Sequence, residues 1–292
     1  MTTGAYGPVD PRYAAARRVL LDALQALAPH GPAIVLVGAQ AIYLRTGMGE
    51  IGVAPYTTDG DLALDPTLLG DEPELEAAMT AAGFRLHEPQ LDHPTPGMWV
   101  TPATVEGEEL LVPVDLIVPE GAAAPGGRRG ARLGPHGRRA ARRAAGLEAA
   151  LVDHAAMKVA ALEPDDLRSF DVQVARPAAL LVAKTHKIRD RLGSRRPDRA
   201  DDKDAADVYR LMQTTAPAEI GDRLAALLDD ALAGEATRDA IGYLSDLFGR
   251  RDGAGVAMAV RALRLAIPEA QVVTLATAYV EALRAQIDEV RP

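Results

Sequence analysis

Two aspartates separated by one residue form the most informative short motif in the chain. They belong to the stretch Thr57-Thr58-Asp59-Gly60-Asp61, which leads into a run with alternating polar and apolar residues. Alternate residues of an extended chain point to the same face, so we expect the two carboxylates to lie side by side. Adjacent carboxylates repel each other unless a cation separates them, and Mg²⁺ accepts carboxylates together with substrate phosphates. The motif indicates a metal-assisted phosphate site; the alternative is an aspartate that caps a turn.

A third acid, Asp115, stands in the middle of the apolar stretch 112–118. Burying an unpaired carboxylate is costly, so this side chain should either face a site or find a partner. If its strand neighbours the strand of Asp59 and Asp61, the three acids complete a three-carboxylate metal site. The alternative is a simple ion pair between Asp115 and an arginine.

Gly38 stands between the apolar run 33–37 and a helical pattern that extends to Arg45. The free backbone N–H groups at the start of a helix attract anions, which makes this turn a candidate phosphate cradle. A glycine is also common at a strand-to-helix turn for reasons of backbone conformation alone.

Lysine is rare in this chain, and its distribution is uneven. Only four lysines occur, three of them between positions 184 and 203. The charged residues of this region that bear on the argument are Lys184, Lys187, Arg191, Lys203, Asp204 and Asp207. The first three share one face of a predicted helix, and the lysine ammonium is a compact charge that suits phosphate. The pattern favours phosphate handling; the alternative is a pair of surface helices joined by salt bridges.

Hydrophobic periodicity predicts the elements that position these residues. The first part of the chain should contain helices at 13–27, 38–45 and 71–82 and strands at 33–37, 61–64, 98–104, 109–118 and 172–175. Residues 147–174 fit either a helix or strands. Helices dominate from Pro177 onward, at 177–192, 201–213, 217–233, 238–248, 254–266 and 268–288. This order predicts an α/β or α+β domain followed by helices.

Composition excludes several classes of protein. The chain has no cysteine, which removes thiol nucleophiles and Cys-ligated metal centres. It has no apolar run of about 18 residues, so we expect no membrane-spanning helix. The first residues lack the pattern of a signal peptide, and we expect a cytoplasmic protein. The net charge of −9 argues against a wholly basic nucleic-acid coat.

An arginine- and glycine-rich stretch at 121–146 has the opposite charge to the rest of the chain. Its seven arginines are Arg128, Arg129, Arg132, Arg138, Arg139, Arg142 and Arg143, and it contains no acid. We expect a mobile, positive loop that contacts an RNA backbone, although an aromatic content of 4% leaves few platforms for base stacking. The alternatives are a solvated, partly disordered loop and a docking site for an acidic protein.

In this order, the motifs resemble those of nucleotidyltransferases of the DNA polymerase beta superfamily, and within it the AbiEii-type and MenT-like toxin enzymes. The resemblance covers about residues 30–213. Its five pieces are Val37-Gly38-Ala39-Gln40-Ala41, the stretch 57–61, Val114-Asp115-Leu116, the stretch 177–191 and Lys203-Asp204-Ala205-Ala206-Asp207-Val208. It implies a nucleotidyltransferase domain with a mixed sheet flanked by helices at 1–195, followed by an all-helical bundle at 196–292.

The resemblance also implies roles for individual residues. Asp59, Asp61 and Asp115 would hold one or two Mg²⁺ ions, and Asp115 would help to deprotonate the attacking hydroxyl. The remaining residues implied to act on the nucleotide are Gly38, Thr57, Thr58, Lys184, Lys187, Asp204 and Asp207. The chain departs from the family pattern at Ala39, where Ser or Gly is usual, and at Pro55, where an Arg is often found.

The expected activity is Mg²⁺-dependent transfer of a nucleoside monophosphate from an NTP to an acceptor hydroxyl. Toxins of this resemblance modify tRNA ends, so the expected acceptor is the 3′ end of tRNA, with an antitoxin protein as a further partner. Three alternatives stay open: a small-molecule enzyme of the aminoglycoside type, an enzyme that modifies a protein hydroxyl, and a non-catalytic binding module with the same fold.

Overall fold

The computed structural model describes residues 9–47, 56–89, 94–126, 129–194 and 202–291, which group into two compact units. The sheet unit comprises the described residues of Met1–Leu44, Ala54–Ala144 and His154–Ala175. The helical unit comprises those of Arg45–Val53, Ala145–Asp153 and Arg176–Pro292. The helix that begins at Pro177 therefore groups with the helices that follow it, whereas the sequence places the division near residue 195.

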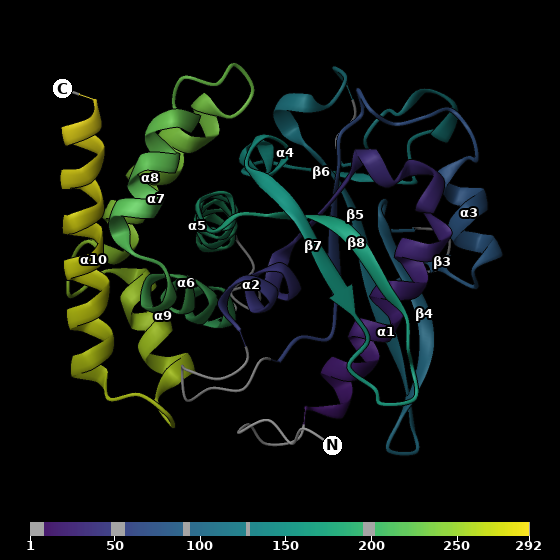
Figure 1. The fold of residues 1–292 in the computed structure, drawn as a ribbon, viewed down its shortest axis with the longest axis horizontal. Helices are drawn as coiled ribbons and strands as arrows, with labels where there is room; N and C mark the ends of the chain where they lie inside the picture. The colour runs from purple at the N-terminus through teal and green to yellow at the C-terminus, as the bar shows by residue number, and fades with distance from the viewer. Residues whose placement is uncertain (1–8, 48–55, 90–93, 127–128, 195–201, 292) are drawn as a thin grey trace. The chain divides into compact units, whose positions relative to one another are not determined.

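One mixed, open sheet forms the centre of the sheet unit (Figure 1). Its strands are β1 (Ile34–Val37), β2 (Gly60–Leu64), β3 (Arg85–Leu86), β4 (Met98–Val105), β5 (Glu108–Pro119), β6 (Arg142–Ala144), β7 (His154–Ala160) and β8 (Ser169–Ala175). Their order is β3-β4-β5-β2-β1-β8-β7, and β6 pairs with the end of β5. The pairs β2–β5, β1–β8 and β5–β6 are parallel and the others are antiparallel. The predicted α+β class with a mixed sheet is confirmed.

Helices α1 (Pro11–Ala26), α2 (Gly38–Thr46) and α3 (Leu75–Ala81) accompany the sheet. The Asp10 carboxylate accepts hydrogen bonds from the backbone of Arg12 and Tyr13, which fixes the start of α1. The buried face of α1 packs on β2, β4 and β5. This packing ties α1 to the two strands that carry Asp61 and Asp115.

A two-residue turn connects β4 to β5. Glu106 and Gly107 both have positive φ, at 51° and 85°, the conformation of a two-residue turn that matches the twist of its strands. Trp99 on β4 is 1% exposed, and its indole Nε1 donates to the Ala140 carbonyl at 2.9 Å. This contact joins the hairpin to the arginine-rich segment.

The ambiguous stretch 147–174 contains both kinds of element. Helix α4 (Glu148–Val152) is followed by β7, which pairs with β8 along its whole length. Pairing with a partner strand decides the conformation of β7, and local composition alone carries no such information.

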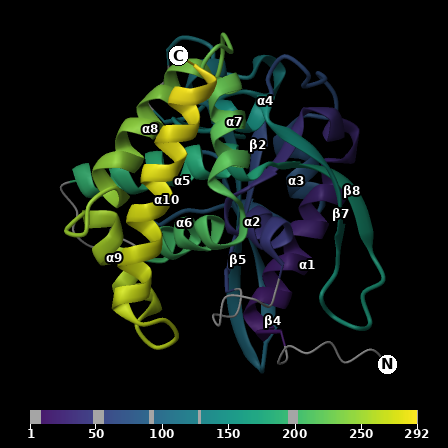
Figure 2. The same cartoon turned by 60° about the vertical axis from the view of Figure 1, so that its left-hand side comes forward.

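The helical unit contains α4 and six longer helices. These are α5 (Pro177–Gly193), α6 (Asp202–Thr214), α7 (Pro217–Leu227), α8 (Gly234–Phe248), α9 (Ala254–Leu263) and α10 (Glu269–Val290). Helix α5 packs on α6 and α8, and α10 packs on α7 and α9 (Figure 2). The Asp230 carboxylate accepts from the backbone of Leu232 and Ala233, so α7 ends before the predicted position 233. No helix in the described ranges has the length and apolar character to cross a membrane.

Candidate functional site

Two of the three sequence-predicted acids lie on neighbouring strands in the same register. Asp61 on β2 is the partner of Asp115 on β5 in the parallel pair. Neighbouring strands lie about 4.8 Å apart, and register partners point to the same face. The sheet therefore brings these two carboxylates together, as the spacing of the motifs predicts.

Asp61 also covers the turn at the start of α2. Gly38 has a φ of +69°, and a Cβ at this position would overlap the Asp61 carboxylate. Only glycine combines this backbone conformation with the missing side chain. The sequence predicts a phosphate cradle at Gly38, and in the structure a carboxylate lies there, at a helix end that favours negative charge.

The segment that precedes β2 positions Asp59. Thr57 is fully buried, and its hydroxyl donates to Asp59 Oδ1. The Gln40 side-chain amide donates to the Asp59 backbone carbonyl at 2.9 Å, and the Tyr43 hydroxyl donates to the Tyr56 carbonyl at 3.0 Å. Two side chains of α2 thus hold the two ends of segment 56–59, which fixes the backbone from which Asp59 projects.

Thr58, in contrast, is exposed. Pro55, one of the departures from the family pattern, lies outside the described residues.

Asp115 forms an ion pair with Arg142 on β6. The guanidinium of Arg142 donates to Asp115 Oδ2 from Nη2 at 2.7 Å and from Nε at 3.1 Å. The second oxygen, Oδ1, is buried and has no hydrogen-bond partner among the described residues. The alternative of an Asp–Arg ion pair is thus confirmed, and the pair leaves one carboxylate oxygen unused.

The donor set does not form the expected three-carboxylate metal centre. Within the described ranges, no group of three or more His, Cys, Asp or Glu side chains is arranged to hold a metal ion. Arg142 supplies the positive charge that a metal ion would otherwise bring to Asp115. The chemistry of Asp59 and Asp61 still suits Mg²⁺, which proteins commonly hold through one or two carboxylates together with substrate phosphates.

A second charged cluster lies within the helical unit, between α5 and α6. Lys184 is 4% exposed, and its Nζ lies 2.7 Å from Asp204 Oδ1 and 2.6 Å from Asp207 Oδ2. Lys187 lies 3.4 Å from Asp204, and Arg191 donates to the second oxygen of Asp204. The helix pattern predicts this meeting of charges correctly, but the cluster is buried and not on the surface.

The cations of α5 and the carboxylates of α6 stabilise each other's charged forms. Burial alone would lower the pKa of Lys184, but Asp207 and Asp204 outweigh it and raise that pKa well above its ordinary value. Burial would raise the pKa of Asp204, yet Lys184, Lys187 and Arg191 hold it below its usual range. The Lys184 ammonium is fully engaged, so in this arrangement it acts as a link between two helices.

The described part of the arginine-rich segment is ordered, which corrects the expectation of a mobile loop. Ala131 and Leu133 are buried, Ala131 pairs with Ala141 through the backbone, and β6 joins the sheet. Small apolar residues between the arginines provide this packing, and a glycine is required where Gly130 approaches the Arg138 carbonyl.

The arginines of this segment have different surroundings. Three are ion-paired, in the pairs Arg139–Glu76, Arg142–Asp115 and Arg143–Glu120. Arg129, Arg132 and Arg138 are exposed, and Arg128 lies outside the described residues. Only part of the sequence-predicted positive surface is therefore available to a partner.

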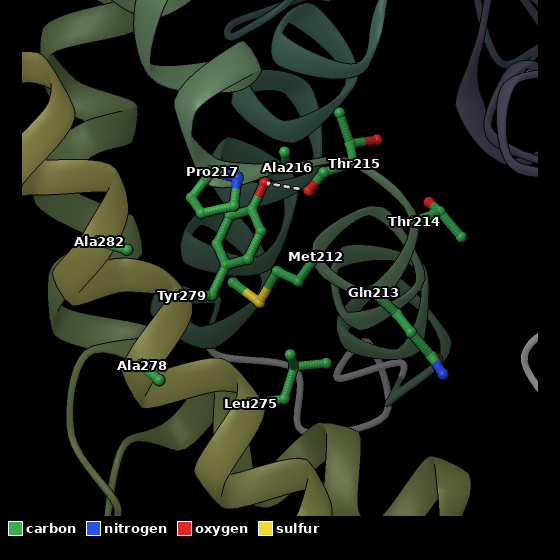
Figure 3. Close-up of a pocket in the computed structure, with 10 residues that line it drawn as sticks. All are labelled: Met212, Gln213, Thr214, Thr215, Ala216, Pro217, Leu275, Ala278, Tyr279 and Ala282. Carbon is green, nitrogen blue, oxygen red and sulfur yellow. Dashed lines mark hydrogen bonds between the residues drawn. The ribbon is translucent and has the colours of Figure 1, made fainter.

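A shallow pocket in the helical unit contains no comparable chemistry. Its volume is about 400 Å³, and it lies where the end of α6 and the start of α7 meet α10 (Figure 3). Met212, Leu275 and Ala278 supply apolar lining, and the Tyr279 hydroxyl donates to the Thr215 carbonyl at 3.0 Å. No ionised side chain is among its lining residues.

Three residues that sequence reasoning does not single out support the candidate site: Arg17, Gln40 and Arg142. A signal exists for Arg17, because it stands among the apolar positions of α1 that the helical period assigns to the core. Gln40 lies within a motif already identified, but nothing in the pattern marks its side chain as a ligand of the backbone. Arg142 is one of seven similar arginines, so its pairing depends on the fold.

A comparison of the chain with protein-family models finds no match, and a comparison with curated protein sequences finds none either.

Proposed function

We propose that this protein is a Mg²⁺-dependent nucleotidyltransferase that moves a nucleoside monophosphate from an NTP to an acceptor hydroxyl. One observation carries the proposal: Asp61 and Asp115 are register partners on parallel strands, and Asp61 covers the glycine that opens α2. Carboxylates on neighbouring strands repel each other unless a cation lies nearby, and the start of a helix, where Asp61 lies, also attracts phosphate.

Asp59 and Asp61 would hold the metal together with the nucleotide phosphates. The bound ion would neutralise charge on the transferring phosphoryl group. The protein's own contribution is to fix the two carboxylates: Gln40 and Thr57 hold Asp59, and strand β2 holds Asp61. Positioning of this kind is the main part of catalysis in phosphoryl transfer.

Asp115 would accept the proton of the attacking hydroxyl. Arg142 occupies Oδ2, whereas Oδ1 is buried and has no hydrogen-bond partner among the described residues, so this step requires the acceptor to reach Oδ1 by a local opening of the site. The acceptor oxygen forms a bond to the α-phosphorus, the bond from that phosphorus to the pyrophosphate oxygen breaks, and the proton moves to Asp115 Oδ1. A base within hydrogen-bond reach of the hydroxyl is what this step requires.

We propose RNA, and specifically a tRNA 3′ end, as the acceptor, in a toxin that an antitoxin protein controls. The exposed Arg129, Arg132 and Arg138 support this choice, because guanidinium groups on a surface bind phosphate backbones. An acidic antitoxin would fit the same surface.

Incubation with each of the four α-labelled NTPs, Mg²⁺ and total RNA tests the proposal. We expect label on RNA with the wild-type protein and none with Asp59→Ala. Label on protein or on an added aminoglycoside would keep the transferase and change its acceptor class. Failure of the wild-type protein to label any of these acceptors would overturn the enzymatic proposal.

A second candidate is a non-catalytic binding module that keeps the fold. Its supporting observations are the enclosure of Lys184 by two carboxylates and the lack of a three-acid metal group in the described ranges. Calorimetry with a non-hydrolysable NTP separates the two candidates: Mg²⁺-dependent binding without any transfer would favour the module.

A further inference from the structure

Arg17 is buried in the sheet unit, and its partners among the described residues are all uncharged. It is 2% exposed, and burial lowers its pKa. Its three hydrogen bonds all go to neutral oxygens, which are Gln40 Oε1 at 2.7 Å, the Ala160 carbonyl at 3.0 Å and the Tyr13 hydroxyl at 3.0 Å. No carboxylate forms an ion pair with it in the described part of the chain. A buried charge with neutral partners is costly, so its location calls for an explanation.

The guanidinium determines the orientation of Gln40. Arginine can only donate hydrogen bonds, so the oxygen of the Gln40 amide must face Arg17 and the NH₂ group must face away. That NH₂ group donates to the Asp59 carbonyl at 2.9 Å and to the Ala16 carbonyl at 3.3 Å. Gln40 is 1% exposed, and these contacts fix the direction in which both its amide oxygen and its NH₂ group point.

We propose that Arg17 and Gln40 are positioning residues that fix Asp59 for phosphoryl transfer; the inference rests on the proposed function. Arg17 sets the rotation of the Gln40 amide, and Gln40 holds the backbone carbonyl of the residue whose carboxylate would bind Mg²⁺. Tyr43, one turn along α2 from Gln40, holds the Tyr56 carbonyl in the same way.

A purely structural role explains these contacts less well. Well-packed apolar side chains usually stabilise a core at least as much as buried charged groups do. A chain selected for stability alone would gain from an apolar pair at positions 17 and 40. An apolar pair could not donate the hydrogen bond that Gln40 makes to the Asp59 carbonyl.

The decisive variant is Gln40→Glu, with Gln213→Glu as the matched control. A glutamate at position 40 can pair with Arg17, which supports folding, but it presents an oxygen to the Asp59 carbonyl where the wild type presents a donor. Gln213 is an exposed residue on α6, so the control makes the same chemical change away from the sheet.

We expect two effects in Gln40→Glu. Amide exchange in peptides that cover 56–61 should become at least about tenfold faster than in the control. The kcat should fall about 100-fold, the scale associated with small errors of position, while the nucleotide KM stays within about fivefold because the Asp59 carboxylate is still present. Arg17→Lys, which keeps a donor for Gln40, should retain kcat within about threefold, and Arg17→Met should lose about tenfold.

Unchanged exchange in 56–61 would overturn the proposal, whatever the kcat. Faster exchange with a kcat equal to that of Gln213→Glu would overturn it as well. If the wild-type protein transfers no nucleotide but Gln40→Glu still accelerates exchange, the positioning contact stands and the proposed function fails. If Gln40→Glu does not fold, the Arg17→Met and Arg17→Lys pair decides by the same two measurements.

Discussion

The sheet unit and the helical unit each contain a cluster of charged residues, and the two clusters differ in how completely their charges are matched. In the helical unit, Lys184 lies between Asp204 and Asp207 with almost no exposure. In the sheet unit, Asp61 and Asp115 stand in register, and Asp115 keeps one buried oxygen without a partner among the described residues. The first arrangement has its opposite charges in contact, whereas the second keeps one Asp115 oxygen for a further ligand.

This difference indicates that one cluster stabilises the fold and that the other serves a functional site. A buried charge cluster whose hydrogen bonds are complete fixes two helices relative to each other, and removing one member leaves an uncompensated charge. A cluster with an unsatisfied oxygen and like charges side by side is poor for stability and suits a functional site. We therefore expect charge removal to reduce stability in the helical unit and activity in the sheet unit.

Lys184→Met should give the largest effect. It leaves Asp204 and Asp207 buried without their shared cation, so the free energy of unfolding should fall by roughly 3–5 kcal/mol. Denaturant titration measures this change. Adding Asp204→Leu and Asp207→Leu should recover much of the loss, and a single variant as stable as the wild type would show that the cluster does not link α5 to α6.

Arg142→Met tests the expectation that charge removal in the sheet unit reduces activity more than stability. Asp115 loses the group that orients it, so kcat should fall about 10- to 100-fold, less than the roughly 10²–10⁴-fold that the base itself contributes. The pair is partly exposed, and the free energy of unfolding should fall by only about 1–2 kcal/mol.

Arg142→Lys, which keeps one donor, is the control and should recover part of the kcat. Steady-state kinetics and thermal denaturation of both variants test this prediction, and equal activity in wild type and Arg142→Met would contradict it.

Acid should weaken the helical cluster. The pKa of Asp204 is depressed in the folded state, so its contribution is present above the ordinary aspartate pKa of about 3.9 and is lost as the pH falls through the folded pKa. Its contribution to the free energy of unfolding should decline by roughly 1 kcal/mol between pH 5 and pH 3.

The pKa of Lys184 is raised, so its contribution is lost only as the pH rises well above about 10.4. Asp204→Asn should show a shallower acid slope in denaturant titrations at each pH. An identical slope in wild type and variant would remove Asp204 from this explanation.

The exposed arginines should give the smallest effect. Replacing Arg129, Arg132 and Arg138 with glutamine should reduce the slope of log K for single-stranded RNA against log salt concentration by about 2. Filter binding at several salt concentrations measures the slope. The matched control replaces three exposed arginines of the helical unit, Arg238, Arg251 and Arg284. A similar change of slope in both variants would show that the arginine-rich segment has no specific role in RNA binding.

The sequence predicts the sheet and its acids well because these depend on short-range patterns. The alternation in 61–64, the apolar run around Asp115 and the glycine before α2 each mark an element and its orientation. The partnership of Asp61 with Asp115 follows once their strands are neighbours.

Long-range pairing is what the sequence cannot supply. Arg142 lies 27 residues from Asp115, and only β6 beside β5 selects it from among seven arginines. The burial of Lys184 is similar: the helical period places its charges on one face, but the packing of α5 against α6 and α8 decides whether that face meets water. For Arg17, the residue type predicts a surface position, whereas its place in the helical period predicts a core position.

Nucleotide transfer and stability, measured on the same preparation of Asp61→Asn, test the central claim most directly. We expect transfer of label from NTP to fall by roughly 10³-fold, as when one charge-stabilising group of a site is removed. We also expect the free energy of unfolding to stay within about 1 kcal/mol of wild type, because asparagine keeps the size of the side chain and one hydrogen-bonding oxygen. Transfer at the wild-type level would contradict this claim. So would a large loss of stability in which the smaller folded fraction accounts for all of the lost transfer.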